Sequence, residues 1–200
     1  MSSATTRGTA VRGRVLSAAQ SVFAARGFDA GSLNDVAEQA GMSRHNLLYY
    51  YPSKKQLLVA LLEARDADFD ARLQWMESPS HLSYDDFVQR LVELMPAIYA
   101  DRELVLLYHR LTIEAADPDH PAHEWVLSRY RRTRAAARRV VEDAIAHDVL
   151  SPDLDIDGLV AALLGAIEGI EAQWLVEPEL DWNRATGALL ALMRLATKPN

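Results

Sequence analysis

The chain has 200 residues, half of them hydrophobic, which suffices for one medium domain or for a small and a larger domain. It contains no cysteine, and this excludes disulfides, thiolate nucleophiles and thiolate metal sites. The formal net charge of -7 is unevenly distributed: residues 1–65 carry eight Lys/Arg and four Asp/Glu, whereas residues 66–200 carry thirteen and twenty-four. A basic N-terminal part on an acidic body favours a phosphate contact at that end, and ordinary surface variation is the alternative.

The N-terminal third of the chain has the pattern of short capped helices. Residues 1–9 are rich in Ser, Thr and Gly, and we expect them to be disordered. Gly27 is expected to end the first helix. The apolar residues of that helix follow a 3.6-residue period: Val15, Ala18, Ala19, Val22 and Phe23.

Two short helices are predicted next. Ser32 is a suitable N-cap, with Asp35 three residues later as in a capping box, and Gly41 ends that helix. Ser43 caps a further helix that runs to about Tyr50, before Pro52.

The rest of the chain is predicted to be helical, without strand-like alternation of useful length. Ser53 caps a long helix near 54–76, and later helices are expected near 84–100, 102–115, 121–149, 156–175 and 182–197. The longest apolar stretch, residues 159–170, is interrupted by Gly165, Glu168 and Gly169. We therefore expect neither a signal peptide nor a membrane span, and a cytoplasmic protein without a membrane partner.

Residues 32–55 have the spacing of a helix-turn-helix. Gly41 supplies the positive φ that the turn needs. The second helix presents Arg44, His45 and Asn46 in its first turn, where a recognition helix meets the edges of base pairs. Arginine can bind guanine and asparagine can bind adenine through two hydrogen bonds each. The pattern therefore predicts that this helix reads double-stranded DNA.

Other residues of this region are expected to contact the DNA backbone. The hydroxyls of Tyr49 and Tyr50 are placed to donate to phosphates, and Lys54 lies at the start of the next helix, where phosphate is favoured. Ser32 and Ser43, at the starts of the two short helices, complete the candidate DNA-binding set. Three further arginines are candidates for an arm on the backbone or in the minor groove: Arg7, Arg12 and Arg14.

The stretch from Val11 to Leu58 resembles the TetR-type family of transcriptional regulators. The resemblance rests on segments 15–19, 23–28 and 35–43 together with Ser32, Leu47, Tyr49, Ser53 and Lys54. The combination is highly specific, whereas any one piece would be weak. The family often has Tyr, His and Phe where this chain has Leu48, Tyr50 and Tyr51, and small residues are common where it has His45. These differences bear on which operator sequence is bound.

The resemblance implies an all-α protein. It implies an N-terminal three-helix helix-turn-helix DNA-binding domain and a C-terminal helical ligand-binding and dimerisation domain. We expect a disordered arm at 1–9, the DNA-binding domain at 10–53 and the helical body at 54–200. The implied function is a ligand-responsive transcriptional regulator, a repressor released from its DNA operator by a small-molecule effector. It would be a homodimer formed through the last two long helices.

The C-terminal pattern agrees with such a dimer. Small residues that lie near one face of the helix at 156–175 let another helix approach closely: Ala161, Gly165, Gly169 and Ala172. Apolar residues cover the adjoining faces, which is typical of one arm of a four-helix dimer interface. The alternative is that these faces pack only within one chain.

Aromatic and polar residues of the body are candidates for lining an effector pocket. They are Trp75, Met95, Tyr99, Tyr108, His109, Trp125, Glu168 and Trp174. Each of them taken singly is more often an ordinary core residue. The carboxylate of Glu168 could receive a cationic ligand or could make a hydrogen bond in an interface.

Two further groups of charged residues have compositions that suggest a site. The set Asp117, Asp119, His120, His123 and Glu124 has the composition of a metal site, but its spacing is that of no recognised site and nearby prolines indicate a turn. No metal and no cofactor is therefore expected. The arginines between residues 129 and 139 spread around a helix, as a solvated face paired with acids or as a second DNA surface.

Two other classes of function compete with the regulator. An enzyme is disfavoured because the chain has neither a Gly-rich phosphate loop nor a nucleophile elbow, and the pair Glu168 and Glu171 has no companion residues. The other competitor is a helical protein-interaction module that uses the helix-turn-helix only for packing. The exposed positions expected for Arg44, His45 and Asn46 argue against it.

Overall fold

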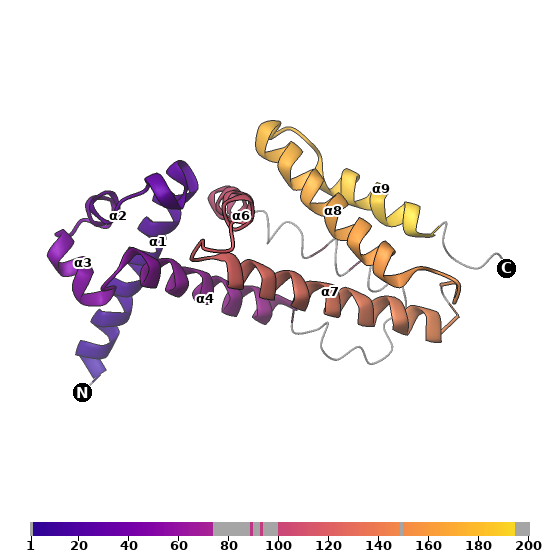
Figure 1. Ribbon diagram of the computed structural model, residues 1–200, viewed down its shortest axis with the longest axis horizontal. Helices are drawn as coiled ribbons and strands as arrows, with labels where there is room; N and C mark the ends of the chain where they lie inside the picture. Colours follow the sequence, from indigo (N-terminus) through magenta and orange to yellow (C-terminus); the bar gives the residue numbers. More distant parts are fainter. Residues whose placement is uncertain (1, 74–88, 90–92, 94–99, 149, 195–200) are drawn as a thin grey trace. The chain divides into compact units, whose positions relative to one another are not determined.

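The computed structural model describes residues 2–73, 89, 93, 100–148 and 150–194, and the regular elements among them are α-helices (Figure 1). The expected all-α class is confirmed. In chain order the helices are α1 (Ser2–Ala30), α2 (Leu33–Gln39), α3 (Arg44–Tyr50), α4 (Lys54–Leu73), α6 (Arg102–Glu114), α7 (His123–Ala146), α8 (Ile156–Val176) and α9 (Trp182–Arg194). The helix expected near 84–100 lies outside the described residues apart from Gln89, Glu93 and Ala100.

Helix α1 differs from the expectation at both of its ends. It begins at Ser2, so the segment 1–9 that we expected to be disordered is helical from its second residue. Extending an existing helix costs far less than nucleating one, and no proline interrupts these residues. At the other end, Gly27 breaks the helical backbone with φ 78° and ψ 168°, after which helical structure resumes as far as Ala30.

The caps predicted from the sequence are present. The Ser32 hydroxyl accepts a hydrogen bond from the Asp35 backbone N–H at 3.2 Å, and the Asp35 carboxylate accepts from the Ser32 backbone N–H at 2.9 Å. Ser43 accepts from the Asn46 N–H at 3.2 Å. Gly41 has φ 66°, as the turn between α2 and α3 requires. These bonds satisfy backbone donors that a helix start leaves unpaired, and they fix where α2 and α3 begin.

The residues divide into two compact units, one of Met1–Asp70 with Glu103–Leu127 and the other of Ala71–Arg102 with Ser128–Asn200. The first unit therefore contains α1, α2, α3, most of α4, and nearly all of α6. Its core includes fully buried Val15, Phe23, Val36, Leu47 and Leu57. The division expected at residues 53 and 54 does not coincide with these units, because α6 packs on α1.

Three side chains of α6 bind α1 within the first unit. The Glu114 carboxylate accepts from the Phe28 backbone N–H, at 3.3 Å to Oε1 and 3.2 Å to Oε2. Arg110 donates to the Ala25 carbonyl at 2.9 Å, and Glu103 accepts from the Ser21 hydroxyl at 2.6 Å. The end of α1 is therefore held by residues more than 80 positions away in the sequence.

Phe28 is the centre of a small cluster in the same unit. Its ring meets the rings of Phe23 and His120 edge to face, with centroids 5.6 and 5.3 Å apart. The Lys54 ammonium lies 4.4 Å from the centroid of the Phe28 ring and donates to the Asp29 carbonyl at 3.0 Å. The cluster therefore joins the end of α1, the start of α4 and the turn that follows α6.

The second unit is built from the rest of α7 with α8 and α9. Its core contains Val141, Ala144, Leu150 and Val160. Arg138 on α7 donates to Glu142 at 2.8 Å and pairs with Asp157 on α8. The rings of Trp174 and Trp182 lie 6.4 Å apart, between the end of α8 and the start of α9.

Helix α8 bears on the expectation that no segment spans a membrane, without deciding it. Among the described residues, it is the one helix long and apolar enough to cross a membrane by length and composition, with a mean hydropathy of 1.5 in an 18-residue window. Gly165, Glu168 and Gly169 were expected to prevent this, but two glycines and one acid are too few to offset the surrounding Leu, Ile, Val and Ala. Only 11% of the window is buried within the chain.

Gly27 should tolerate no side chain. Its φ and ψ fall in a region that is essentially restricted to glycine, and a Cβ atom there would overlap the Glu114 carboxylate. We expect Gly27→Ala to lower the free energy of unfolding in urea by about 1–3 kcal/mol. Gly13→Ala in the same helix is the control, because a Cβ at Gly13 meets nothing within 4 Å and should leave stability equal or higher. Equal effects of the two substitutions would contradict this role of Gly27.

Asp35 should contribute to the pH dependence of stability. Hydrogen bonds from the Ser32 side chain and backbone, assisted by the charge of Arg26, lower the pKa of the Asp35 carboxyl. A lowered pKa means that the folded state favours the carboxylate, so this contribution is fully present above about pH 4 and is lost as pH falls through the lowered pKa. We expect Asp35→Asn to reduce stability at pH 7, with the difference from wild type shrinking in acid.

The measurement for Asp35 is urea unfolding of both proteins between pH 7 and pH 3. Glu38→Gln, at an exposed position of the same helix, is the matched control for loss of one negative charge. A difference between wild type and Asp35→Asn that stays constant over this range would contradict the assignment.

Candidate nucleic-acid interface

Helix α3 is held by one buried side chain and exposes the rest of its first turns. Leu47 is completely buried against the core of the first unit, whereas Arg44, His45 and Asn46 are all exposed. The Ser43 cap starts the helix, and the Tyr51 N–H donates to the Leu47 carbonyl at its end, at 2.9 Å. The three predicted base-reading residues therefore lie together on the outer face of α3.

Two tyrosines continue that face toward the end of α3. Tyr49 is 83% exposed, and its ring meets the Tyr50 ring at right angles with centroids 5.3 Å apart. A tyrosine that packs in a core would be mostly buried, so the exposed fraction of Tyr49 argues against a core-packing role. Its hydroxyl is free to meet a partner such as a phosphate oxygen.

A groove of about 600 Å³ lies between the third and fourth turns of α1 and helix α3 with the turn before it. Its lining consists of Val11, Arg14, Gly41, Met42, Ser43, Asn46, Tyr49 and Tyr50. Among these described lining residues, Arg14 carries the only charge. The sequence alone did not predict a groove here, because it does not show how α1 lies relative to α3.

Ser32 and Lys54 lie apart from this groove lining. The Ser32 hydroxyl donates to the Asp35 carboxylate at 2.7 Å, in addition to capping α2. Lys54, half-buried, is engaged with Asp29 and Phe28 as described above. Both residues therefore have structural partners within the first unit, whereas Arg44, His45 and Asn46 present their side chains outward.

The predicted effector-binding residues fall into three groups. Trp75, Met95 and Tyr99 lie outside the described residues. Tyr108, His109 and Trp125 lie in the first unit, where the Tyr108 ring is 6.1 Å from the His109 ring and 6.3 Å from the Trp125 ring. Glu168 and Trp174 belong to the second unit.

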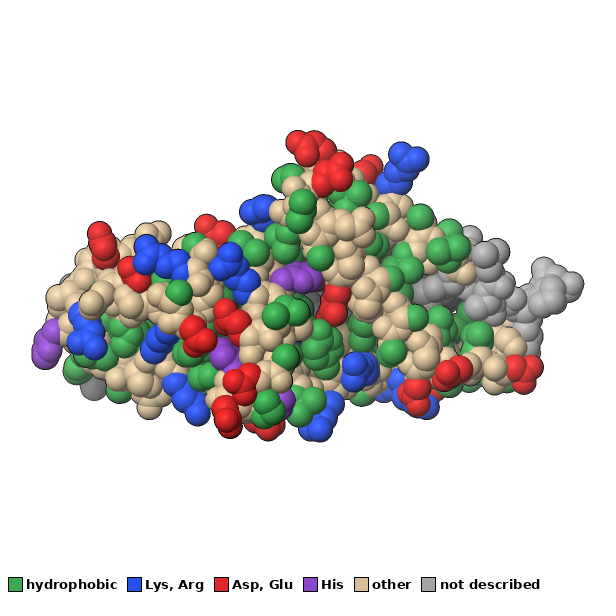
Figure 2. Space-filling view, turned by 45° about the horizontal axis from the view of Figure 1, so that its top comes forward, with side chains coloured by type: hydrophobic (Ala, Val, Ile, Leu, Met, Phe, Trp, Pro, Cys, Tyr) green, Lys and Arg blue, Asp and Glu red, His purple; other side chains and the backbone are tan. Residues whose placement is uncertain are grey.

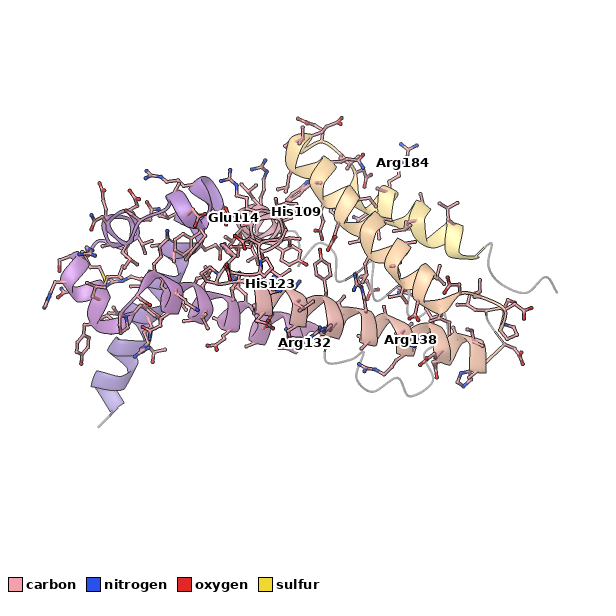
Figure 3. All side chains as sticks on the ribbon, in the orientation of Figure 1. His109, Glu114, His123, Arg132, Arg138 and Arg184 are labelled. Carbon is pink, nitrogen blue, oxygen red and sulfur yellow. The ribbon has the colours of Figure 1, made fainter. Side chains whose placement is uncertain are left out.

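The two histidines near the turn 115–122, His120 and His123, have protein partners, and Figure 3 shows His123 at the start of α7. His123 Nδ1 lies 2.8 Å from the Ala115 carbonyl, and His120 Nδ1 accepts from the Ala122 N–H at 3.2 Å. His120 Nε2 is buried 3.6 Å from the Glu114 carboxylate. No group of three His, Cys, Asp or Glu residues in the described part of the chain has an arrangement suited to a metal ion.

Comparison with known proteins agrees with this geometry. Residues 15–61 match the family model of bacterial regulatory proteins of the tetR family. The chain is 25% identical over 168 residues to the HTH-type transcriptional repressor KstR2 of Mycolicibacterium smegmatis, covering 82% of this chain and 78% of that protein. It is 50% identical over 48 residues to the HTH-type transcriptional regulator RutR of Escherichia coli, covering 24% of this chain and 23% of that protein.

The fold is shared over almost the whole length of the chain. A crystal structure of a transcriptional regulator from Saccharomonospora viridis in complex with choline has a TM-score of 0.76 at 22% identity, covering 92% of this chain and 95% of that one. The matched family model contains the exposed face of α3 and its caps. The chain is therefore a DNA-binding transcriptional regulator rather than an enzyme, and its residues 15–61 match the tetR family of bacterial regulatory proteins.

Proposed function

We propose that this protein is a homodimeric repressor that binds a DNA operator and releases it when a small molecule binds the helical body. The observation that carries the DNA-binding role is the outward presentation of Arg44, His45 and Asn46 on a helix fixed by the buried Leu47. Such a helix can enter a major groove without rearrangement of the core. Repression follows the relative KstR2, which is a transcriptional repressor.

We assign distinct roles to the residues of the interface. Arg44 and Asn46 read base edges, and His45 extends the same face. Tyr49 and Tyr50 bind phosphates, which fix the register of the protein on DNA but carry no sequence information. Ser32 and Ser43 act through the helix starts that they cap. Lys54 strengthens binding to every sequence alike, through its charge and its contact with the end of α1.

The homodimer is inferred from the exposed apolar surface of α8 and α9. Val176 and Leu192 are 85% and 63% exposed, and Ala161 and Gly165 on α8 are exposed as well. Figure 2 shows hydrophobic side chains exposed among the polar ones on this side of the molecule. Within the described residues, a Cβ atom at Gly165 or Gly169 would meet no heavy atom within 4 Å. We take a second copy as the occupant of this surface because small residues permit close helix approach and a two-fold operator needs two reading helices. The proposed protein acts in the cytoplasm and has no membrane partner.

The effector site is proposed on α6 and the start of α7, around Tyr108, His109 and Trp125. Two aromatic rings and an imidazole supply an apolar wall with few polar groups, which suits a small organic molecule. The relative of similar fold from Saccharomonospora viridis binds choline, so the fold accommodates a ligand of that size. The effector-binding roles of Trp75, Met95, Tyr99, Glu168 and Trp174 stay predictions from the sequence and are not assigned to this site.

Ligand binding would reach the DNA-binding helices through α6. This helix carries Tyr108 and His109, and its Glu103, Arg110 and Glu114 bind α1. A ligand that favours one position of α6 therefore also favours one arrangement of α1 in each subunit. If that arrangement suits half-sites about 34–36 Å apart less well, linkage requires the ligand to weaken DNA binding.

Substitutions in α3 should separate base reading from backbone binding. We expect Arg44→Ala and Asn46→Ala each to reduce affinity for the operator by about 1–3 kcal/mol and to relax the preference over scrambled DNA. Lys54→Ala is the comparison and should weaken both DNAs by the same factor. The measurement is fluorescence anisotropy with the DNA that flanks the protein's own gene. A preference for operator over scrambled DNA that survives both α3 substitutions would contradict base reading by α3.

The dimer surface can be tested at Gly165. Because the chain itself leaves space around this position, we expect Gly165→Leu to keep the fold and to shift the protein from dimer to monomer in sedimentation equilibrium. Ala135→Leu, at an exposed position of α7, is the control and should remain dimeric. A folded Gly165→Leu protein that stays fully dimeric would exclude this face of α8 from the interface.

A further inference from the structure

The third turn of α1 places an arginine, Arg12, beside the recognition helix. The Arg12 guanidinium carbon lies 5.8 Å from the centroid of the Tyr50 ring and 5.8 Å from the centroid of the Tyr51 ring. Arg12 itself is exposed. Figure 1 shows the N-terminal part of α1 extending away from α2, α3 and α4. The guanidinium therefore lies over two aromatic rings that belong to the C-terminal end of α3.

Tyr51 fixes the position of Arg12. Tyr51 is only 5% exposed, and it occupies the C-cap of α3 directly before Pro52. Its ring is therefore less mobile than that of a surface side chain. Burial raises the pKa of the Tyr51 hydroxyl, and the charge of Arg12 with a side-chain hydrogen bond to it acts in the opposite direction. The hydroxyl is thus available to hold the guanidinium in one place.

An arginine held in this way has most of its donors left over. A guanidinium carries five N–H groups in a fixed plane, and one hydrogen bond with a phenol engages one of them. Contacts with Tyr50 and Tyr51 restrict the side chain of Arg12 before any partner binds, so less side-chain entropy is lost when a partner does bind. The remaining N–H groups suit the paired oxygens of a phosphate.

The surroundings of Arg12 favour an anion. The adjoining groove between α1 and α3 contains Arg14 as the charged member of its described lining, together with the polar groups of Ser43, Asn46 and Tyr49. Asn46 lines this groove and also stands on the face that we assign to base reading. A phosphate that occupies this side of α3 would therefore belong to the same stretch of DNA.

We propose that Arg12, positioned by Tyr51, binds a backbone phosphate next to the base pairs that α3 reads, so that the third turn of α1 forms a second DNA-contact surface. The inference rests on the proposed DNA-binding function. It assigns Arg12 to the backbone and not to base edges, because its orientation is set by protein contacts and by no recognition helix. Tyr51 acts as a positioning residue that has no contact of its own with DNA.

The test compares full-length wild type, Arg12→Ala, Tyr51→Phe and Arg139→Ala by fluorescence anisotropy over a salt series. The probes are the DNA flanking the protein's own gene and a scrambled duplex. Each lost phosphate contact reduces the slope of log affinity against log salt by about 0.9, which amounts to about 1.8 for a dimer. We expect Arg12→Ala to show this change and to weaken binding to both duplexes about 10-fold or more at 0.1 M salt.

Two comparisons separate this inference from simpler explanations. Arg139 on α7 is exposed. Arg139→Ala removes the same charge as Arg12→Ala, and it should leave the salt slope unchanged. Tyr51→Phe keeps the ring and loses the hydroxyl, so it should weaken binding by a smaller factor with the wild-type slope retained. Thermal melting of each variant checks that Arg12→Ala remains folded.

Several results would overturn the inference. Wild-type binding that Arg12→Ala leaves unchanged would reject it while preserving the proposed function. Weaker binding with an unaltered slope would show that Arg12 only braces α3, and equal effects of Arg139→Ala would show a general charge effect. Tyr51→Phe identical to wild type would remove the positioning role. A wild-type protein that binds no DNA at low salt would reject both this inference and the proposed function.

Discussion

The hydrogen bonds between the Phe28 backbone N–H and the Glu114 carboxylate are the contact on which the first unit depends. Gly27 makes them possible, because its left-handed backbone turns the next peptide toward α6 and leaves room for the carboxylate. The Phe28 ring also contacts His120 in the turn after α6 and Lys54 at the start of α4. A DNA-reading head and part of the body thus share one core, so a change in α6 cannot leave α1 unaffected.

Local features of the fold were predictable from the sequence, and distant ones were not. The caps at Ser32 and Ser43 and the positive φ of Gly41 involve groups within a few residues of one another, so sequence spacing suffices to find them. The hydrogen bond from Phe28 to Glu114 joins residues 86 positions apart, and no local sequence pattern predicts it. The sequence marked Gly27 as a helix end but could not show that its conformation serves a partner on α6.

The candidate site also has features that the sequence predicts and features that it does not. The exposed face of α3 follows from helical periodicity once Leu47 is recognised as the buried residue, so Arg44, His45 and Asn46 could be predicted together. The pairing of Arg12 with Tyr50 and Tyr51 depends on how α1 crosses α3, which periodicity does not give. The same holds for the aromatic residues of the body, because their composition suggests a pocket while only packing brings Tyr108 beside Trp125.

The placement of α6 in the first unit has a consequence for protein engineering. A chimera that joins the first 53 residues of this chain to the body of another regulator would cut through a single folded unit. It would discard the partners of Ser21, Ala25 and Phe28, which are Glu103, Arg110 and Glu114. Biosensors that exchange reading heads between such regulators therefore need to transplant the matching surface of α6 along with the helix-turn-helix, or to graft only the exposed face of α3 onto an intact chain.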